Sequence, residues 1–447
     1  MNQKRARAWA MYDWANSAFA TTMIAAVLPV FYQTVAAADL DGAVATSYWA
    51  FSQTIAMILV AVLAPLLGAA ADQGGRKGLF LLVAAIVGAV ASALIGFTGR
   101  GDYVAVSVLF IIATLGFSGG NTFYDAMLRD IAPPDQRHAL SARGYTYGYL
   151  GGGLLLLVHI VLIQGWASFG FTSQIQAMQI VFMTAGLWWL LFSIPLFRNV
   201  PLIEPKHKHT DPSQSSPQTG VFRTVKQSVK SVLRTLLHIK KYPELFKYLV
   251  AFWLFNDGIS TIISMAAIYG AEIGIGATHL IAALLITQFV GVPFTFLFEK
   301  LPVKIGAKNA LYLSLGFYVL IVIVGYFMNS PLHFYILAAM VGMVQGGSQS
   351  LARSIYSQLV PASKATEFFG FMSLSGKVSA ALGPAVFGLT AALTGTSRLA
   401  ILSVMFFFLA GMWFLTKVDL SKGEREAAED DDPSVPPDRY TPSGFTW

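Results

Sequence analysis

The chain of 447 residues contains no cysteine and few charged residues. Without cysteine the protein has no disulfides, no zinc-thiolate or iron-sulfur site and no cysteine nucleophile. Charged residues make up 12% of the chain, about half their usual share in soluble domains, whereas hydrophobic residues reach 55% and the mean hydropathy is +0.61. This balance excludes a water-soluble globule, and lipid must solvate most of the surface.

The net charge of +7 does not indicate a nucleic-acid partner. The Lys and Arg residues lie in short loops between apolar runs and form no continuous patch, an arrangement that follows membrane topology. The N-terminus begins like a signal peptide, but the apolar run that follows contains Asp13 and Asn16. We therefore expect a retained first span and a lipid bilayer as the surroundings of the protein.

About twelve apolar runs are long enough to cross a bilayer, which requires about 20 helical residues. They cover residues 9–34, 47–70, 78–98, 103–127, 142–164 and 176–197, then 246–271, 279–298, 307–328, 332–352, 367–392 and 397–416. The sequence thus predicts an all-α integral membrane protein. Lys and Arg concentrate in every second connection, so the positive-inside rule places both termini and the central loop in the cytoplasm.

A polar segment of residues 198–245 divides two apolar halves of similar length. Within it, valines from 221 to 232 and Leu236 recur at helical spacing opposite a basic row, which predicts either an amphipathic helix on the membrane or a solvated tether. We assign residues 1–197 and 246–416 to two six-helix bundles, and we expect the acidic tail 417–447 to be a disordered cytoplasmic segment.

The two halves resemble each other. Residues 119–134 resemble residues 346–361, with Pro134 opposite Pro361, and a weaker match relates the stretch from Trp14 to the stretch from Leu254. A repeat in the same orientation implies two bundles around an axis normal to the membrane, with a central site between them. This architecture is typical of transporters.

The loop between the second and third runs, Gly-Ala-Ala-Ala-Asp-Gln-Gly-Gly-Arg-Lys from Gly68, is similar to the loop motif of the major facilitator superfamily. Asp72, Gly75, Arg76 and Lys77 match the motif. In the second half, the corresponding segment has Val303 where the acidic residue is expected.

Residues 12–22, Tyr-Asp-Trp-Ala-Asn-Ser-Ala-Phe-Ala-Thr-Thr, form an unusually polar string for a membrane span. They resemble the opening of the family that includes the fungal autophagy-related vacuolar amino-acid effluxer and its bacterial relatives. The resemblance implies the major facilitator fold and a solute porter, and it points to amino-acid export. The compact length is similar to that of the bacterial relatives, which implies a bacterial inner membrane.

The loop motif predicts a conformational latch. Asp72 lies at the end of a span, where it can accept hydrogen bonds from a helix N-terminus or pair with a basic residue, and Arg76 can meet Asp125 or Asp130. Alternatively, the basic residues only anchor the topology. The candidate latch residues are Asp72, Gly75, Arg76, Lys77, Asp125 and Arg129.

Polar residues inside the apolar runs predict a substrate cavity, because such groups are costly in lipid unless they face protein or water. In the first span Asp13, Ser17 and Thr21 share a helical face beside Asn16, and they line either a cavity or a buried hydrogen-bond network. In the tenth, Gln345, Gln349 and Arg353 recur every four residues and either line the cavity or pair with span seven. The candidate cavity residues are Asp13, Asn16, Ser17, Asn121, Tyr124, Asn256, Asp257, Gln345, Gln349 and Lys377.

Asp257 and Lys377 lie within apolar runs of the second half, where a lone charge costs several kcal/mol. We expect them to offset each other, either as a proton-coupling switch or as a permanent ion pair. Gly144, Gly148 and Gly152 predict close helix packing in span five. That span lacks the Gly-Pro pair of many antiporters of the superfamily, which leaves the direction of transport open.

A rival interpretation is an intramembrane serine hydrolase, because residues 116–120 fit Gly-x-Ser-x-Gly around Ser118 and His159 follows in the next span. A receptor without transport activity and a lipid scramblase also remain alternatives. We expect no enzyme, no metal and no cofactor. The prediction is a monomeric secondary transporter that binds a small molecule, with proton coupling left open.

Overall fold

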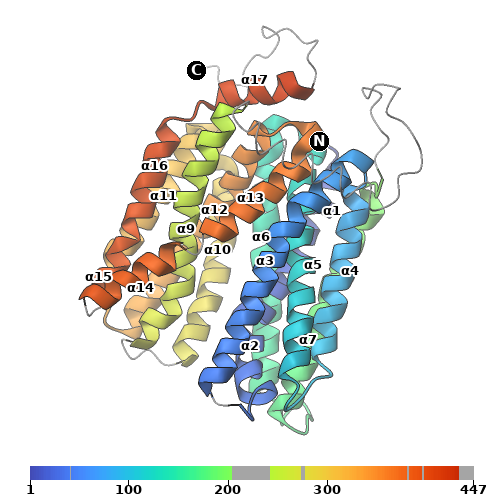
Figure 1. Ribbon diagram of the computed structural model, residues 1–447, viewed down its shortest axis with the longest axis vertical. Helices are drawn as coiled ribbons and strands as arrows, with labels where there is room; N and C mark the ends of the chain where they lie inside the picture. Colours follow the sequence, from blue (N-terminus) through green and yellow to red (C-terminus); the bar gives the residue numbers. More distant parts are fainter. Residues whose placement is uncertain (41, 204–241, 273–276, 380–381, 395–396, 432–447) are drawn as a thin grey trace.

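The computed structural model describes residues 1–40, 42–203, 242–272, 277–379, 382–394 and 397–431. The regular elements in these residues are helices that run along one long axis in two groups (Figure 1). The first group contains α1 (Gln3–Ala18), η1 (Phe19–Ala26), α2 (Val27–Phe31), η2 (Tyr32–Ala36), α3 (Gly42–Gly74), α4 (Lys77–Ile95), α5 (Tyr103–Ile131), η3 (Pro134–Gln136), α6 (Arg137–Gln164) and α7 (Gln174–Asn199).

The second group follows residues 204–241, which lie outside the described residues together with the predicted amphipathic linker helix. It contains α9 (Pro243–Glu272), α10 (Ala277–Ile305), α11 (Ala307–Tyr326), α12 (Pro331–Leu359), η6 (Ala362–Lys364), α13 (Ala365–Ser379), α14 (Leu382–Thr394), α15 (Ser397–Ser403), α16 (Met405–Thr416) and α17 (Leu420–Asp431).

The helices account for all twelve predicted spans. Within the described residues, ten helices are long and apolar enough to cross a membrane, and they coincide with predicted spans one to nine and twelve. Span ten is α12, whose 29 residues suffice in length, although its polar stripe lowers its hydropathy. Span eleven is covered by α13 and α14, and residues 380–381 between them lie outside the described residues. The protein is therefore an all-α membrane protein.

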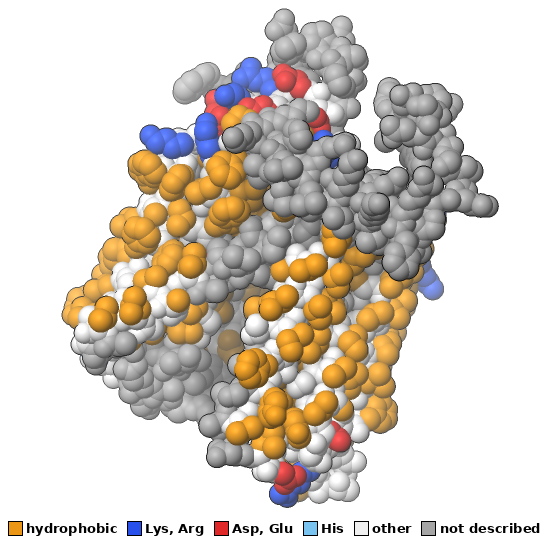
Figure 2. Space-filling model, in the orientation of Figure 1, with side chains coloured by type: hydrophobic (Ala, Val, Ile, Leu, Met, Phe, Trp, Pro, Cys, Tyr) orange, Lys and Arg blue, Asp and Glu red, His pale blue; other side chains and the backbone are white. Residues whose placement is uncertain are grey.

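The outer faces of the helices are apolar, as lipid requires. On α4, Val83, Val87, Val90 and Leu94 recur at helical spacing and are all exposed. Figure 2 shows apolar side chains along the length of both groups, with charged side chains gathered at the two ends. The charged ends mark where the molecule leaves the hydrocarbon region.

Each group of helices has a hydrophobic core of its own. Buried aromatic residues centre both cores, with Trp9 and Trp189 in the first group and Tyr248, Tyr318 and Phe408 in the second. Tyr318 and Phe408 stack with ring centroids 5.1 Å apart. The two groups therefore pack as separate bundles, and the contacts between them form a distinct interface.

The start of the C-terminal tail is helical, so the prediction of disorder is wrong for α17. Asp430 accepts a hydrogen bond from Lys364 at 2.9 Å, and the backbone N–H of Asp419 donates to Glu244 at 2.9 Å. These contacts tie both ends of α17 to the second bundle. The composition of the tail predicts disorder, but this part of it is ordered because the Asp430 carboxylate and the backbone N–H of Asp419 each have a fixed partner. Residues 432–447 lie outside the described residues.

Glycines of α6 allow close approach to α1. A Cβ atom at Gly151 would lie 2.5 Å from the carbonyl oxygen of Trp14, and one at Gly148 would lie 2.7 Å from the hydroxyl of Ser17. These contacts agree with helix packing as the role of the span-five glycines.

We expect Gly151→Ala to destabilise the protein by about 1–3 kcal/mol, because the added methyl group must displace backbone. Gly119→Ala is the matched control, since a Cβ at this helical position meets no atom within 4 Å. Thermal unfolding in detergent measures both variants. Equal unfolding midpoints would contradict the packing role.

Candidate functional site

The two bundles meet through polar contacts at one end of the molecule. We call this the linker end, because α7 ends and α9 begins there, on either side of the polar segment; the N-terminus and α17 lie at the same end (Figure 1). Its centre is Arg353 of α12, which is 4% exposed. One guanidinium nitrogen lies 2.9 Å from Asp125 of α5 and 3.6 Å from Asp13 of α1. The other nitrogens donate to the hydroxyl and carbonyl of Ser141 of α6, both at 2.9 Å. A cation from the second bundle is thus surrounded by acceptors from the first.

Aromatic rings complete the enclosure of Arg353. Its guanidinium carbon lies 4.8 Å from the ring centroid of Trp9 and 4.5 Å from that of Tyr145. Tyr124 stacks on Trp9 and donates its hydroxyl proton to Asp13 at 2.7 Å. Such rings strengthen the attraction for a desolvated cation. Tyr124, one of the candidate cavity residues, is in this structure part of the Arg353 enclosure.

The contact between Arg353 and Asp125 joins equivalent positions of the repeat. Pro133 precedes η3 and Pro361 precedes η6, so the structural register is offset by one residue from the sequence match of Pro134 with Pro361. In this register Asp125 corresponds to Arg353. Equivalent positions near a pseudo-twofold axis face each other, and opposite charges make that meeting attractive.

The same register relates two amide pairs. Asn16 donates to Asn121 at 2.7 Å within the first bundle, and Gln349 donates to Asn256 at 3.3 Å within the second. Each pair joins the first span of its bundle to the fourth. Gln349 thus pairs with span seven, one of the two arrangements expected for it. The amide pairs place hydrogen-bonding groups at corresponding depths of both bundles.

Other candidate residues lie around these pairs. The Ser17 side chain packs on Gly148 and Gly152 of α6, and its carbonyl accepts a hydrogen bond from Thr21. Gln345 is half-buried on α12, one turn before Gln349. The first bundle therefore uses Ser17 in packing between α1 and α6.

First-bundle arginines also hold the C-terminal end of α12. Arg129 and Arg137 both donate to the carbonyl oxygen of Ser357, at 3.1 and 3.2 Å. Carbonyl groups in the last turn of a helix lack intrahelical partners and carry partial negative charge. The pair of cations therefore binds the end of α12 by charge as well as by hydrogen bonds.

Asp72 of the first bundle binds the first turn of α13 in the second bundle. Its carboxylate accepts the backbone N–H of Glu367, in the first turn of α13, at 2.9 Å. A carboxylate at a helix N-terminus is favoured by the helix dipole. The turn at Gly75, with φ of 60°, ends α3 and brings Asp72 to this position.

The prediction that Arg76 meets Asp125 or Asp130 is wrong. Asp125 pairs with Arg353, and Asp130 accepts from Lys77 at 3.0 Å, while Arg76 is exposed. Lys77 is 5% exposed and also lies 3.7 Å from Asp72. The buried cation of the loop motif is therefore Lys77.

The second bundle has an acidic counterpart that the sequence match missed. Glu299 of α10 lies one helical turn before Val303, and its carboxylate accepts two hydrogen bonds from Arg143 of α6, at 2.6 and 2.9 Å. The sequence could have indicated this residue, because Glu299 lies one helical turn from the position where the acidic residue was expected. Both bundles thus contribute a carboxylate to the interface at the linker end.

The structure describes the side chain of Asp257 but not that of Lys377. Asp257 is 1% exposed, and its carboxylate accepts the backbone N–H of Gly383 at 3.0 Å. The side chain of Lys377 lies outside the described part of the chain. The partner found for Asp257 is therefore the backbone of Gly383 in α14.

The motif around Ser118 is not an esterase elbow. Ser118 lies within the continuous helix α5, and the strand-turn-helix geometry of that motif is not formed there. The two ring nitrogens of His159 lie 3.0 and 3.1 Å from the hydroxyls of Thr22 and Thr184. His159 therefore joins η1, α6 and α7.

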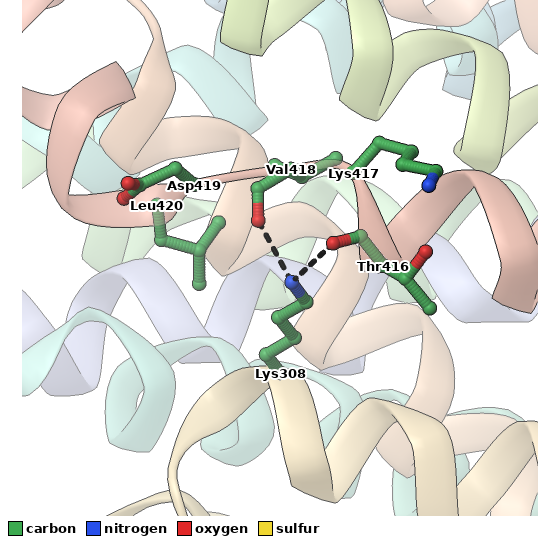
Figure 3. A pocket seen from close by; sticks show the side chains of 6 residues that line it. All are labelled: Lys308, Thr416, Lys417, Val418, Asp419 and Leu420. Atoms are coloured by element: carbon green, nitrogen blue, oxygen red, sulfur yellow. Dashed lines mark hydrogen bonds between the residues drawn. The ribbon is translucent and has the colours of Figure 1, made fainter.

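A pocket of about 460 Å³ lies at the linker end of the second bundle (Figure 3). Lys308 donates into it to the carbonyl oxygens of Val418 and Thr416, at 2.7 and 3.4 Å. Thr416 is the last residue of α16 and Val418 follows two positions later, so Lys308 caps the C-terminal end of that helix. The pocket is distinct from the Arg353 cluster.

A family model described as "Vacuole effluxer Atg22 like" matches residues 40–138 and 129–428. The chain is 33% identical to the uncharacterized MFS-type transporter YxiO of Bacillus subtilis, over 95% of this chain and 98% of that protein. It is 24% identical to autophagy-related protein 22 of Coccidioides immitis, over 86% of this chain and 74% of that protein.

Solved structures show the same fold. The human organic anion transporter MFSD10 matches with a TM-score of 0.70 at 12% identity, over 92% of this chain and 99% of that chain. The proton:xylose symporter XylE matches with a TM-score of 0.66 at 15% identity, over 94% and 96%. At these identities the likeness concerns the arrangement of helices.

Proposed function

The chain belongs to the Atg22-like family of the major facilitator superfamily, and on this basis we propose that it is a secondary transporter that moves a small polar solute by alternating access. The observation that carries the proposal is Arg353, a buried cation of one bundle held by two carboxylates of the other. Such a contact between bundles closes one side of the molecule and can be broken as a unit.

The polar contacts at the linker end favour a reversible gate. Arg353, Asp72 and Glu299 all bind across the interface through charge, and none of these contacts requires the bundles to interlock. Separation of the bundles at this end would break them together. A solute that binds better to one arrangement then shifts the population between closed and open states.

The amide pairs support a small polar solute as cargo. Asn16 with Asn121 and Asn256 with Gln349 provide donors and acceptors inside otherwise apolar spans. Amino acids, the class implied by the resemblance of residues 12–22, are the first candidates, and export is the first direction to test. We assign both termini to the cytoplasmic side, because Lys and Arg concentrate in alternate connections. The compact length, similar to that of the bacterial relatives, supports a bacterial inner membrane as the location, and we propose a monomer as the transporting unit.

Counterflow in proteoliposomes tests this function. Vesicles that hold the purified chain are loaded with an unlabelled amino acid or peptide, and uptake of the labelled form is compared with uptake into empty vesicles. We expect transient accumulation for at least one member of the panel. Absence of flux, with accelerated flipping of a labelled phospholipid in the same vesicles, would instead support the scramblase.

The variant Ser118→Ala separates the hydrolase from the transporter. Because Ser118 lies on the continuous helix α5, away from any elbow, we expect its replacement to leave counterflow unchanged. Peptide cleavage that is lost in this variant would contradict the proposed function.

A further inference from the structure

The C-terminal helix α17 lies across the linker end of the second bundle and packs on α9, α12 and η6 (Figure 1). One face of this helix is buried, because Ala427 is 0% exposed and Leu420 packs against the core of the second bundle. Gly423 lies so close to the side chain of Leu359, the last residue of α12, that a Cβ atom at Gly423 would clash with it. Helix α17 is therefore a fitted part of the second bundle.

Polar contacts fix both ends of α17 on the second bundle. At its beginning, the backbone N–H of Asp419 donates to the buried carboxylate of Glu244 at 2.9 Å. At its end, Asp430 accepts hydrogen bonds from Lys364 at 2.9 Å and from the hydroxyl of Tyr242 at 2.8 Å. Because the anchors belong to α9, η6 and the residue before α9, we expect α17 to move with the second bundle.

Two cations of the first bundle approach α12 beside this helix. Arg129 and Arg137 both donate to the carbonyl oxygen of Ser357, which lies two residues before Leu359. Two guanidinium groups that share one acceptor repel each other, and the end of a helix offers only about half a negative charge against two full positive charges. A carboxylate close to the pair would therefore stabilise the contact.

Glu424 of α17 supplies this negative charge. Its side chain is half-buried. Burial raises the pKa of Glu424, and the positive charges of Arg137 and Arg129 oppose this rise because they favour the carboxylate. Among the acidic residues that act on Arg137, Glu424 has a larger effect than Asp130 and Asp135, which belong to the first bundle. The principal negative charge for Arg137 therefore comes from the opposite bundle.

The far end of α17 lies next to a second contact between the bundles. Asp430 holds Lys364, the last residue of η6, and α13 begins at the next residue. The first turn of α13 contains Glu367, whose backbone N–H donates to Asp72 of the first bundle. Helix α17 therefore supports the two second-bundle elements, α12 and α13, that first-bundle charges bind at this end.

We propose that α17 is a strap that holds the linker end closed, with Glu424 as the group that binds it to the first bundle. The strap moves with the second bundle, whereas Arg129 and Arg137 move with the first. Separation of the bundles takes the carboxylate away from both cations, which makes opening less favourable. The strap thus shifts the population towards the closed state when no solute is bound. This inference deepens the proposed function and rests on it only for the consequence in transport.

Cysteine labelling of the full chain in lipid nanodiscs tests the strap without a solute. Ser350→Cys places a thiol at a position of α12 that is 1% exposed and whose carbonyl accepts a hydrogen bond from Ser141 of the first bundle. This position lies two helical turns before Ser357, so it reports on the interface and not on the surroundings of Glu424. We expect Glu424→Gln to accelerate labelling by a polar thiol reagent roughly three- to tenfold, because one charged contact is lost at constant size. Glu424→Asp, which keeps the charge, should label at a rate closer to that of the parent.

Glu429→Gln is the matched control, because Glu429 lies on the same helix and is exposed. This variant should leave the labelling rate within about twofold of the parent. Equal acceleration in Glu429→Gln and Glu424→Gln would show that the net charge of α17 acts at a distance and would overturn the assignment to Glu424. An unchanged rate in Glu424→Gln would overturn the strap.

A background without the two arginines tests the partners of Glu424. In the double variant Arg129→Gln with Arg137→Gln, addition of Glu424→Gln should change the labelling rate by less than about twofold, because the partners are absent. An effect as large as in the parent would show that Glu424 acts only within the second bundle and would overturn the strap. A lower unfolding midpoint of Glu424→Gln without faster labelling would also assign Glu424 to stability alone.

Transport measurements separate this inference from the proposed function. With an amino acid found active in counterflow, Glu424→Gln should retain exchange, because Glu424 lies on α17, outside the membrane spans. Exchange in the parent chain together with unchanged labelling in Glu424→Gln would overturn the strap and leave the proposed function in place. Absence of all flux in the parent chain would contradict the proposed function, and the labelling rates would still decide whether α17 holds the bundles together.

Discussion

Replacement of Arg353 by Ala is expected to open the linker end and to lower transport by roughly two orders of magnitude or more. Asp13 and Asp125 would remain at the bundle interface without their cation, which costs about 3–5 kcal/mol when a buried pair is broken. Because about 1.4 kcal/mol changes a population tenfold, the closed state would become rare. Solute flux in proteoliposomes measures the loss.

The opening is measured separately by cysteine labelling. Ser357→Cys places a thiol at a position that is 0% exposed in the closed interface, and no other cysteine is present. A membrane-impermeant thiol reagent should react slowly in the parent chain and at least about tenfold faster with Arg353→Ala. Arg353→Lys, which keeps the charge and loses the planar fork, should lie between the two.

A second change at Asp125 gives the decisive control. Arg353→Ala with Asp125→Asn removes one stranded carboxylate, so labelling should return part of the way towards the parent rate. Arg100→Ala, at an exposed ion pair with Asp39, should leave labelling unchanged. Slow labelling in Arg353→Ala, equal to that of the parent, would refute the gate.

Replacement of Asp72 by Asn is expected to slow turnover by roughly 5- to 30-fold, because the N-terminus of α13 loses a charged acceptor worth about 1–2 kcal/mol. Lys77 would lose its 3.7 Å neighbour as well. The half-saturating solute concentration should change less than turnover, since Asp72 bonds the backbone of Glu367 at the linker end.

Arg76→Gln is the matched control for Asp72→Asn. Arg76 belongs to the same motif but is exposed, so its replacement should leave turnover within about twofold of the parent. The same initial-rate measurements serve both variants. An equal loss of turnover in the two would show that the motif acts through its overall charge and would reject the capping contact as the cause.

Local patterns in the sequence carried much of the fold. The apolar runs predicted twelve spans because a helix in lipid must satisfy its own backbone and match the bilayer thickness, both of which are properties of short segments. The polar stripe on α12 was also visible, since Gln345, Gln349 and Arg353 recur at the helical period. Its partners were not, because the hydrogen-bonded Arg353 and Asp125 are separated by 228 positions.

The tail shows the limit of composition. Acidic residues around Glu426 predict disorder, yet α17 is helical because Asp430 reaches Lys364 and the N–H of Asp419 reaches Glu244. Lys364 and Glu244 lie far from the tail in the sequence, so the tail sequence alone does not show that these contacts order it. The same holds for Glu299, which replaces the missing acid at Val303 only because α10 lies against Arg143.

The sequence by itself determined that the chain lies in a membrane, that it consists of helices, and that it has two related halves, because lipid solvation and helical periodicity act on neighbouring residues. Only the tertiary structure decided which charges meet. Asp125 faces Arg353 because two bundles pack at equivalent positions, and Asp257 meets Gly383 because α14 packs against α9. Pairing of charges depends on distance in space, and distances between spans follow from packing rather than from order along the chain.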